Sequence, residues 1–94
     1  MTVHIKDPDA IIDWAIDWGQ DYLQEGETIQ SSEWLVEPQE DDGIAVDSSH
    51  HTASTAVAFL SGGVVGNVYR VTNRITTSSG RTDDRSITML VADL

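Results

Sequence analysis

Ser48, Ser49, His50 and His51 are the residues best suited to catalysis, and they follow one another directly in the chain. A serine hydrolase needs a hydroxyl, an imidazole and an orienting carboxylate within hydrogen-bond reach of one another. The stretch should be extended, and adjacent side chains of a strand point to opposite faces, so these neighbours cannot form a triad locally. The chain also lacks a Gly-x-Ser-x-Gly nucleophile elbow. The sequence therefore predicts that the protein is not an enzyme.

Paired carboxylates are the other groups with chemical potential, because hard cations such as Ca²⁺ prefer oxygen ligands. The run Glu40–Gly43 (EDDG) resembles part of a calcium loop, but it lacks the alternating Asp series and the Glu at the twelfth position. The chain has no cysteine, so it can form neither a disulfide nor a thiolate metal site. We favour solvated acids, with no metal and no cofactor, over a weak surface calcium site. The pairs are Asp7–Asp9, Asp13–Asp17, Asp41–Asp42 and Asp83–Asp84.

The formal net charge of −11 is concentrated in the first half of the chain. Residues 1–47 contain 13 acids and one base, whereas residues 48–94 contain three acids and four arginines. An acidic surface repels phosphate, so we expect no binding of nucleic acid. The asymmetry indicates either a solvated acidic face or two unlike patches, which would suit head-to-tail contact in a ring.

A chain of 94 residues is expected to form one domain. Its start lacks the basic end and apolar core of a signal peptide. No apolar run approaches the roughly 20 residues that a membrane helix needs. We therefore expect a soluble protein that is synthesised in the cytoplasm and has no contact with a membrane.

The stretch Val68–Val91 is predicted to form a β-hairpin with the polar loop Ser78–Arg85 between its strands. Val, Ile, Thr and Tyr dominate it, and these residue types suit a half-buried pleated sheet. Because side chains alternate along a strand, every second residue should face the core. In the first strand these are Tyr69, Val71, Asn73, Ile75 and Thr77; in the second they are Ile87, Met89 and Val91.

The stretch Ala10–Trp18 permits two interpretations. As a helix it would be capped by Asp7 and would end at Gly26. As a strand it alternates apolar with small or acidic residues, and we favour this interpretation because the alternation is complete. The apolar face would contain Ile12, Trp14, Ile16 and Trp18. The following segment, Gly19–Gly26, should be a loop or a single helical turn that places Tyr22 and Leu23 under the sheet.

Three more strands are predicted in the middle of the chain. Glu27–Val36 is the first of these, with a bulge near Ser31–Ser32 because its apolar residues do not share one parity. Glu37–Gly43 should be an exposed acidic turn. Ile44–Ser49 restarts a strand, and His50–Ser61 is predicted as one longer strand of small residues on both faces.

Short strands at this spacing are typical of an all-β sandwich, and we expect an immunoglobulin-like β-sandwich of about seven strands. The spacing of Gly66 and Tyr69 fits the tyrosine corner of such domains. Residues 1–9 should be an extended N-terminal segment, followed by a single sandwich domain over residues 10–94. Trp14, Trp18 and Trp34 are expected in the core; an exposed one would be a candidate interface anchor.

Several motifs resemble a family of small structural proteins of tailed bacteriophages, described as fiber-tail adaptor or head–neck–tail accessory proteins. The most specific are KDPDA (residues 6–10), LSGG (60–63) and TNRITT-x-x-GR-x-DDRS (72–86), and the similarity runs over nearly the whole chain in order. The chain departs from the family by the acidic insertion EPQEDDG (37–43) and by extra charge near Asp21 and Glu25. The resemblance implies a non-enzymatic virion protein with an immunoglobulin-like fold, made in the host cytoplasm.

The resemblance leads to the expectation of an adaptor in the neck or tail, which links a tail or connector to fibers in several symmetric copies. Its partners would be other phage structural proteins. The alternatives are a head decoration (capsid cement) protein or a carbohydrate-binding sandwich. The hairpin tip around Arg81 is either self-neutralised or docks on a neighbour through charge-assisted hydrogen bonds. The expected partner-binding residues are Val3, Asp7, Asp9, Gly62, Gly63, Arg81, Asp83, Asp84 and Arg85.

Overall fold

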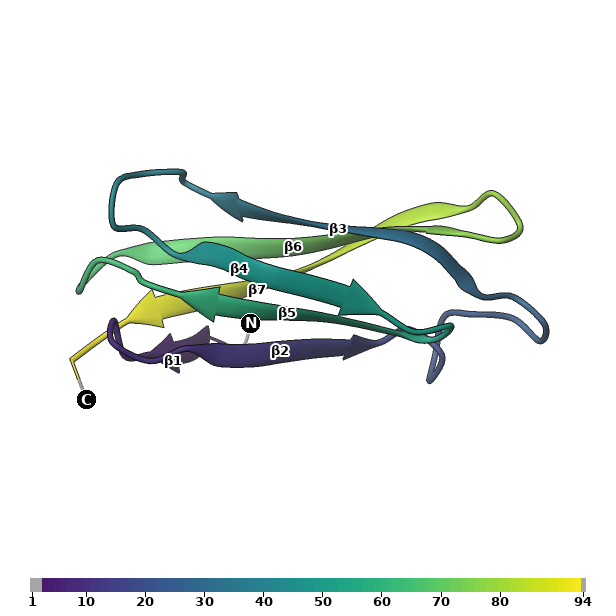
Figure 1. Ribbon diagram of the computed structural model, residues 1–94, viewed down its shortest axis with the longest axis horizontal. Helices are drawn as coiled ribbons and strands as arrows, with labels where there is room; N and C mark the ends of the chain where they lie inside the picture. Colours follow the sequence, from purple (N-terminus) through teal and green to yellow (C-terminus); the bar gives the residue numbers. More distant parts are fainter. Residues whose placement is uncertain (1–2, 94) are drawn as a thin grey trace.

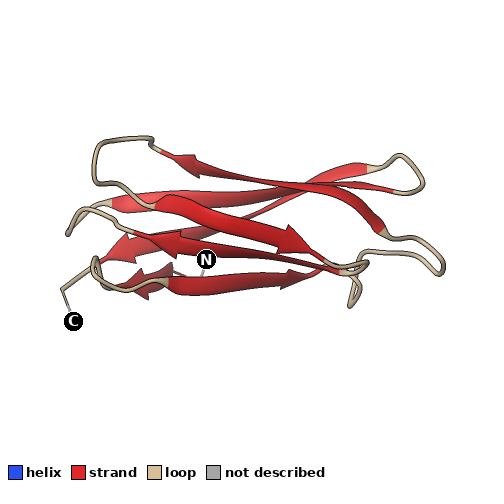
Figure 2. Ribbon diagram, viewed as in Figure 1, coloured by secondary structure: helices blue, strands red, loops and turns tan. Residues whose placement is uncertain are grey.

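The computed structural model describes residues 3–93, and within this range it contains seven β-strands and no helix (Figures 1 and 2). The strands are β1 (Val3–Lys6), β2 (Ile12–Asp17), β3 (Ile29–Glu37), β4 (Ala45–His51), β5 (Thr55–Ser61), β6 (Val68–Thr77) and β7 (Thr82–Val91). They form a four-stranded sheet in the order β1-β7-β6-β3 and a three-stranded sheet in the order β2-β5-β4. The all-β, sandwich-like prediction is confirmed.

No helix long and apolar enough to cross a membrane occurs among residues 3–93.

Alternating side chains explain why β2 and β6 are strands. In β2 the apolar residues Ile12, Trp14 and Ile16 are half-buried and the intervening residues are exposed, so the helical interpretation of this stretch is wrong. In β6 the five residues predicted to face the core, from Tyr69 to Thr77, are all buried.

The second strand of the hairpin begins earlier than its sequence suggested. It starts at Thr82 rather than at Ile87, and only Ser78–Arg81 remain as the turn. The acidic start of β7 is tolerated because its charges are paired across the strands: Asp84 lies opposite Arg74 and accepts two hydrogen bonds from its guanidinium group, at 2.7 and 2.9 Å.

The prediction of one strand over His50–Ser61 was wrong. The strand β4 continues to His51, and β5 begins at Thr55 after a tight turn. Thr52 causes this turn, because its hydroxyl oxygen accepts hydrogen bonds from the backbone N–H groups of Ser54 and Thr55 at 3.3 and 3.1 Å. The hydroxyl thus offers the backbone an alternative to continued sheet pairing.

Two register shifts bend the edge strands. One lies between Ile29 and Ser31 in β3, one residue before the predicted bulge at Ser31–Ser32. The other lies between Val46 and Ser48 in β4 and was not predicted. Both shifts allow residues on either side of the irregularity to keep facing the core.

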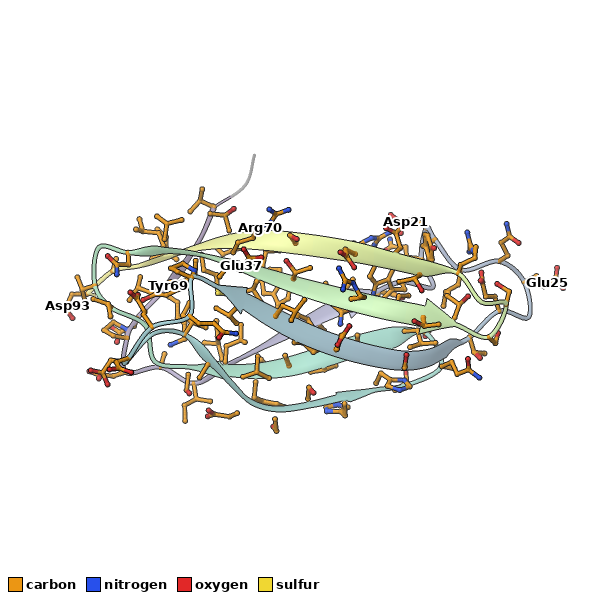
Figure 3. All side chains as sticks on the ribbon, turned by 90° about the horizontal axis from the view of Figure 1, so that it is seen from above. Asp21, Glu25, Glu37, Tyr69, Arg70 and Asp93 are labelled. Carbon is orange, nitrogen blue, oxygen red and sulfur yellow. The ribbon has the colours of Figure 1, made fainter. Side chains whose placement is uncertain are left out.

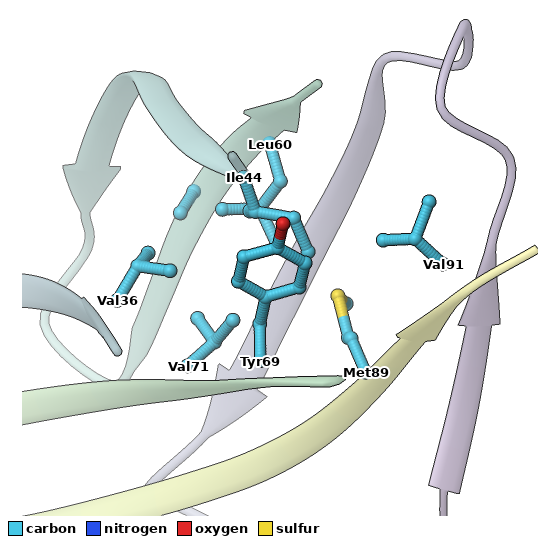
Figure 4. Packing of buried hydrophobic residues seen from close by; sticks show 8 residues of the cluster. Val36, Ile44, Leu60, Tyr69, Val71, Met89 and Val91 are labelled. Atoms are coloured by element: carbon cyan, nitrogen blue, oxygen red, sulfur yellow. The ribbon is translucent and has the colours of Figure 1, made fainter. Parts of the chain in front are cut away.

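Two hydrophobic clusters fill the space between the sheets. The larger one surrounds Tyr69, which Figure 4 shows among Ile44, Leu60, Val71 and Met89. The smaller one contains Trp18, Ile29, Ala56 and Ile75. Tyr22 and Leu23 pack against the smaller cluster, as expected for the loop after β2.

A buried hydrogen bond connects the two sheets. The indole N–H of Trp18, at the end of β2, donates to Asn73 Oδ1 on β6 at 2.8 Å, and both residues are fully buried. The amide nitrogen of Asn73 then donates to Ser32 Oγ at 2.9 Å and to the Glu33 carbonyl oxygen at 3.0 Å. One side chain therefore joins β2, β6 and β3.

The N-terminal segment includes β1, which pairs in parallel with β7 at the edge of the four-stranded sheet. Lettered A to G in chain order, the strands form sheets B-E-D and C-F-G with strand A on G. In a constant-type immunoglobulin sandwich, strand A lies in the B-E-D sheet instead. The immunoglobulin-like assignment and the domain division at residue 9 stay predictions.

We predict that Asn73→Ala destabilises the protein by about 1–3 kcal/mol, because it leaves the buried indole N–H of Trp18 without a partner. Chemical denaturation would measure the change. Arg70→Ala is the matched control on the exposed face of the same strand, with an expected change within about 0.5 kcal/mol. If both variants lowered the free energy of unfolding equally, the hydrogen bonds of Asn73 would make no special contribution to stability and the prediction would be wrong.

Candidate partner-binding surfaces

The loops between strands gather at the two ends of an elongated molecule, whose principal dimensions are 43 × 24 × 18 Å. One end contains the β1–β2 turn, the β3–β4 loop and the β5–β6 connector; the other contains the β2–β3 loop, the β4–β5 turn and the β6–β7 turn (Figure 1). We call them the lysine end and the glutamate end, after the side chain that anchors each. In Figure 3, Asp93 marks the lysine end and Glu25 the glutamate end.

Lys6 anchors the lysine end. It is the only lysine of the chain, and it is 1% exposed because its position in β1 directs it between the sheets. Its ammonium group donates to three carbonyl oxygens: Asp7 at 3.0 Å, Ala10 at 2.6 Å and Gly62 at 2.7 Å. An ammonium has three N–H groups, so each has one acceptor. Desolvation by burial lowers the pKa of Lys6, and the nearby carboxylates oppose this shift.

Close packing explains the glycines of the β5–β6 connector. Gly62 and Gly63 have φ angles of +75° and +114°, which L side chains rarely adopt. A Cβ on Gly63 would lie 2.5 Å from a methyl group of Val91, and one on Gly62 would lie 2.6 Å from the Gly43 carbonyl oxygen. These two predicted partner-binding residues therefore pack against the β3–β4 loop and β7.

The acidic β3–β4 loop is held by Glu40. Its carboxylate accepts hydrogen bonds from the hydroxyl of Tyr69 and, at 3.0 Å, from the amide of Asn67. These bonds lower the pKa of Glu40, while desolvation raises the pKa of Tyr69. The Tyr69 hydroxyl also accepts the backbone N–H of Val64 at 3.0 Å. The loop is therefore exposed, as predicted, but fixed at its base.

Glu27 anchors the glutamate end. Its carboxylate accepts from both Arg81 nitrogens that face it, from the hydroxyls of Thr77 (2.6 Å) and Ser79, and from the backbone N–H of Gln24 (3.0 Å). The bonds from Arg81, then from Gln24, Ser79 and Thr77, hold the pKa of Glu27 far below its usual range. The guanidinium of Arg81 also lies 4.3 Å from the centre of the Tyr22 ring, a cation–π contact.

A second arginine closes the same end. Arg85 donates to Asp21 at 2.5 Å, and its guanidinium carbon lies 4.4 Å from the centre of the Trp18 ring. Both contacts join β7 to the loop after β2. The arginines of the hairpin tip are thus engaged within the chain, although Asp83 beside them stays exposed.

The structure divides the predicted partner-binding residues into separate groups. Asp7, Asp9 and the two connector glycines lie at the lysine end, whereas Arg81 and Asp83–Arg85 lie at or near the glutamate end. Val3 is exposed on the edge strand β1. Nothing brings all of these residues into one site, and their role in binding stays a prediction.

Sequence reasoning missed the two anchoring side chains. The signal for Lys6 is that the chain's single lysine stands just before an Asp-Pro-Asp turn, where its amine can reach the carbonyls of that turn. Glu27 had no local signal, because Thr77, Ser79 and Arg81 are about 50 residues away in sequence.

The structure also places the candidate catalytic residues and the three tryptophans. Ser48 to His51 are exposed along β4, and within residues 3–93 neither serine bonds to a histidine. No group of three or more potential ligands in that range is placed to hold a metal ion. Trp18 is buried, and Trp14 and Trp34 are half-buried against the core, so none of the three forms an exposed platform for a sugar.

Residues 6–90 match the family described as podophage GP4 fiber-tail adaptor protein gp77. The match covers both ends of the sandwich and the strands β2 to β6 completely. In β1 it includes only Lys6, and in β7 it omits only Val91. The comparison with curated proteins gave no match.

We predict that Lys6→Met destabilises the protein by about 1–3 kcal/mol in chemical denaturation, because the three carbonyl oxygens lose a charged donor. Lys6→Arg should not rescue it, since a planar guanidinium cannot reproduce the directions of three ammonium N–H groups. In the native protein an amine-reactive reagent should leave Lys6 unmodified and react with it only in denaturant. Equal labelling under both conditions would contradict the buried position.

Stability should fall as the pH drops, because the folded-state pKa values of Glu27 and Glu40 lie below their unfolded values. Their contribution is complete above the unfolded pKa of about 4.3 and is lost progressively at lower pH. Glu27→Gln should make the thermal midpoint less dependent on pH between about 5 and 3. Glu25→Gln, which changes an exposed carboxylate of the same loop, is the control and should keep the wild-type slope. An unchanged slope in Glu27→Gln would contradict the prediction.

Proposed function

Because the chain belongs to the podophage GP4 fiber-tail adaptor family gp77, we propose that it is a virion adaptor in the neck or tail region. In this role it links a tail or connector to fibers, is present in several symmetric copies, and catalyses no reaction. Its partners are other phage structural proteins, and it is made in the host cytoplasm before assembly. The family match over residues 6–90 is the observation that carries the proposal.

The arrangement of the ends supports an adaptor role. An adaptor must present two surfaces in a fixed relation to each other, and a sandwich 43 Å long presents loops at both ends. Lys6 and Glu27 hold these loops in place before any partner arrives. Pre-ordered loops bind with less loss of conformational entropy than flexible ones.

Purified virions test the proposal directly. Mass spectrometry should detect the chain in particles, and imaging should place it between the tail or connector and the fibers. Particles made without its gene should lack fibers and adsorb poorly to the host. Purified particles that contain none of the chain would refute the virion role, and fragile heads with normal fibers would refute the adaptor position.

We predict that the two ends serve different partners. Asp9→Lys at the lysine end and Asp83→Lys near the glutamate end should each lower the incorporation of one partner, since each reverses an exposed charge at one candidate contact. Complementation of gene-deleted phage, followed by protein quantification of the particles, would measure this. Thermal midpoints should stay near that of the wild type. Normal particles from both variants would exclude these residues from the contacts.

A further inference from the structure

We propose that the groove between β3 and β4 binds an extended segment of a partner protein, which pairs with the free edge of β3 and alternates basic with apolar residues. This inference deepens the adaptor role by giving the chemistry of one partner. It rests on that role only for the identity of the protein that supplies the segment, because the contact can be measured on the purified chain.

The two sheets part between β3 and β4, which are the end strands of their sheets (Figure 1). A groove of about 590 Å³ lies there, lined by residues 34–36, by residues 39–43 of the connecting loop and by residues 44–46. Because successive side chains of a strand point to opposite faces, three consecutive residues on each side indicate that main-chain edges border the groove. On the other side of the sandwich, the rings of His4 and Trp14 fill the space between β1 and β2, with 4.3 Å between their centres.

The groove has an apolar floor. Val36 and Ile44 are 8% and 6% exposed and belong to the larger hydrophobic cluster. Trp34 and Val46 are half-buried against that cluster. The volume is within the range of about 300–1,000 Å³ that is typical of binding pockets. An aliphatic side chain that enters the groove would cover the apolar surface that Trp34 and Val46 leave accessible.

The alternation along β3 selects the chemistry of an added strand. Trp34 and Val36 face the core, whereas Glu33, Leu35 and Glu37 are exposed on the outer face. A strand added at this edge places one residue opposite each of these five, so its inward positions should be apolar. The residues opposite Glu33 and Glu37 should be basic, since opposite charges on neighbouring strands stabilise the pairing. In such recognition, main-chain hydrogen bonds supply affinity and alternate side chains supply specificity.

The nearest arginines do not cancel this preference. Arg70 and Arg74 on β6 are the register partners of Glu37 and Glu33, one strand further from the edge. Arg74 donates to Asp84 at 2.7 and 2.9 Å and lies 3.9 Å from Glu33. Together these five side chains carry three negative charges and two positive ones. The outer face beside the edge therefore keeps a negative balance.

The loop side of the groove adds acids without any cation. Residues 7–69 contain no Lys or Arg. Asp41 and Asp42 in the groove lining are exposed, and their carboxylates have no hydrogen bond or ion pair with residues 3–93. Asp47 is exposed on β4 and accepts only the Ser61 hydroxyl there, at 2.6 Å. A surface of one sign attracts a partner of the opposite sign, so a basic segment is the complementary occupant.

A second copy of this chain is a poor occupant of the same edge. In antiparallel pairing of two β3 strands about Leu35, Glu33 of each copy would lie opposite Glu37 of the other. Like charges directly opposite each other are destabilising, and charged residues on an edge strand hinder pairing between identical edges. The edge therefore selects against itself and in favour of a basic strand.

Fluorescence anisotropy with labelled synthetic peptides tests the contact. The probe has the core Lys-Val-Thr-Val-Lys flanked by threonines, so its lysines have the spacing of Glu33 and Glu37. Its valines have the spacing of Trp34 and Val36. We expect a Kd below about 1 mM at low salt. A peptide with the core Lys-Lys-Thr-Val-Val keeps the charge without the alternation and should bind at least about tenfold more weakly.

Charge reversal locates the contact on the chain. The double variant Glu33→Lys with Glu37→Lys should bind the alternating peptide at least about fivefold more weakly than the control double variant Asp13→Lys with Glu25→Lys. All four residues are exposed and the two variants have the same net charge, so the difference reports on the β3 edge. Thermal midpoints near that of the wild type would exclude misfolding as the cause.

Hydrogen exchange gives an independent readout of where the peptide binds. The alternating peptide should slow exchange within residues 31–37 and leave β1 unchanged. No binding of this peptide, equal binding of both peptides, equal losses in the two double variants, or protection only outside β3 and β4 would each overturn the inference. Detection of the chain in virions is a separate measurement, so the adaptor role and this contact can fail independently.

Discussion

The hydrogen bond from Trp18 to Asn73 is the constraint on which the arrangement of the two sheets depends. Burial of apolar side chains holds sheets together, but it has little directionality and permits sliding. The buried indole N–H of Trp18 has a directional partner in Asn73, whose side chain also donates to Ser32 and to the Glu33 carbonyl oxygen. This network sets β2 over β6 and β3, and Trp18 is itself part of the smaller hydrophobic cluster.

The same requirement for paired polar groups shapes both ends of the molecule. Each N–H group of the Lys6 ammonium donates to a loop carbonyl oxygen, and the carboxylate of Glu27 accepts hydrogen bonds from the β6–β7 turn and from the β2–β3 loop. Because these charges are satisfied internally, they order the loops rather than attract a ligand. The result is a small sandwich whose two ends keep a fixed separation, which is the mechanical requirement of a protein that joins two others.

The distribution of charge also bears on assembly. The acids give the chain its net charge of −11, while Lys6 is buried and Arg74, Arg81 and Arg85 form ion pairs at the surface with acids of the same chain. Repulsion between copies therefore opposes association until the copies are brought together.

The sequence alone determined the all-β class, the inward faces of β2 and β6, and the family, because a side-chain period of two and the order of the motifs are both readable along the chain. It did not determine where β7 begins or that β4 and β5 are separate. The early start of β7 depends on the ion pair between Asp84 and Arg74 on the neighbouring strand, and the break between β4 and β5 depends on the hydrogen bond from the backbone N–H of Thr55 to the Thr52 hydroxyl. Only the tertiary structure showed the roles of Lys6 and Glu27. These depend on which distant residues become neighbours, and that follows from how the strands pair across the sheets rather than from any local spacing.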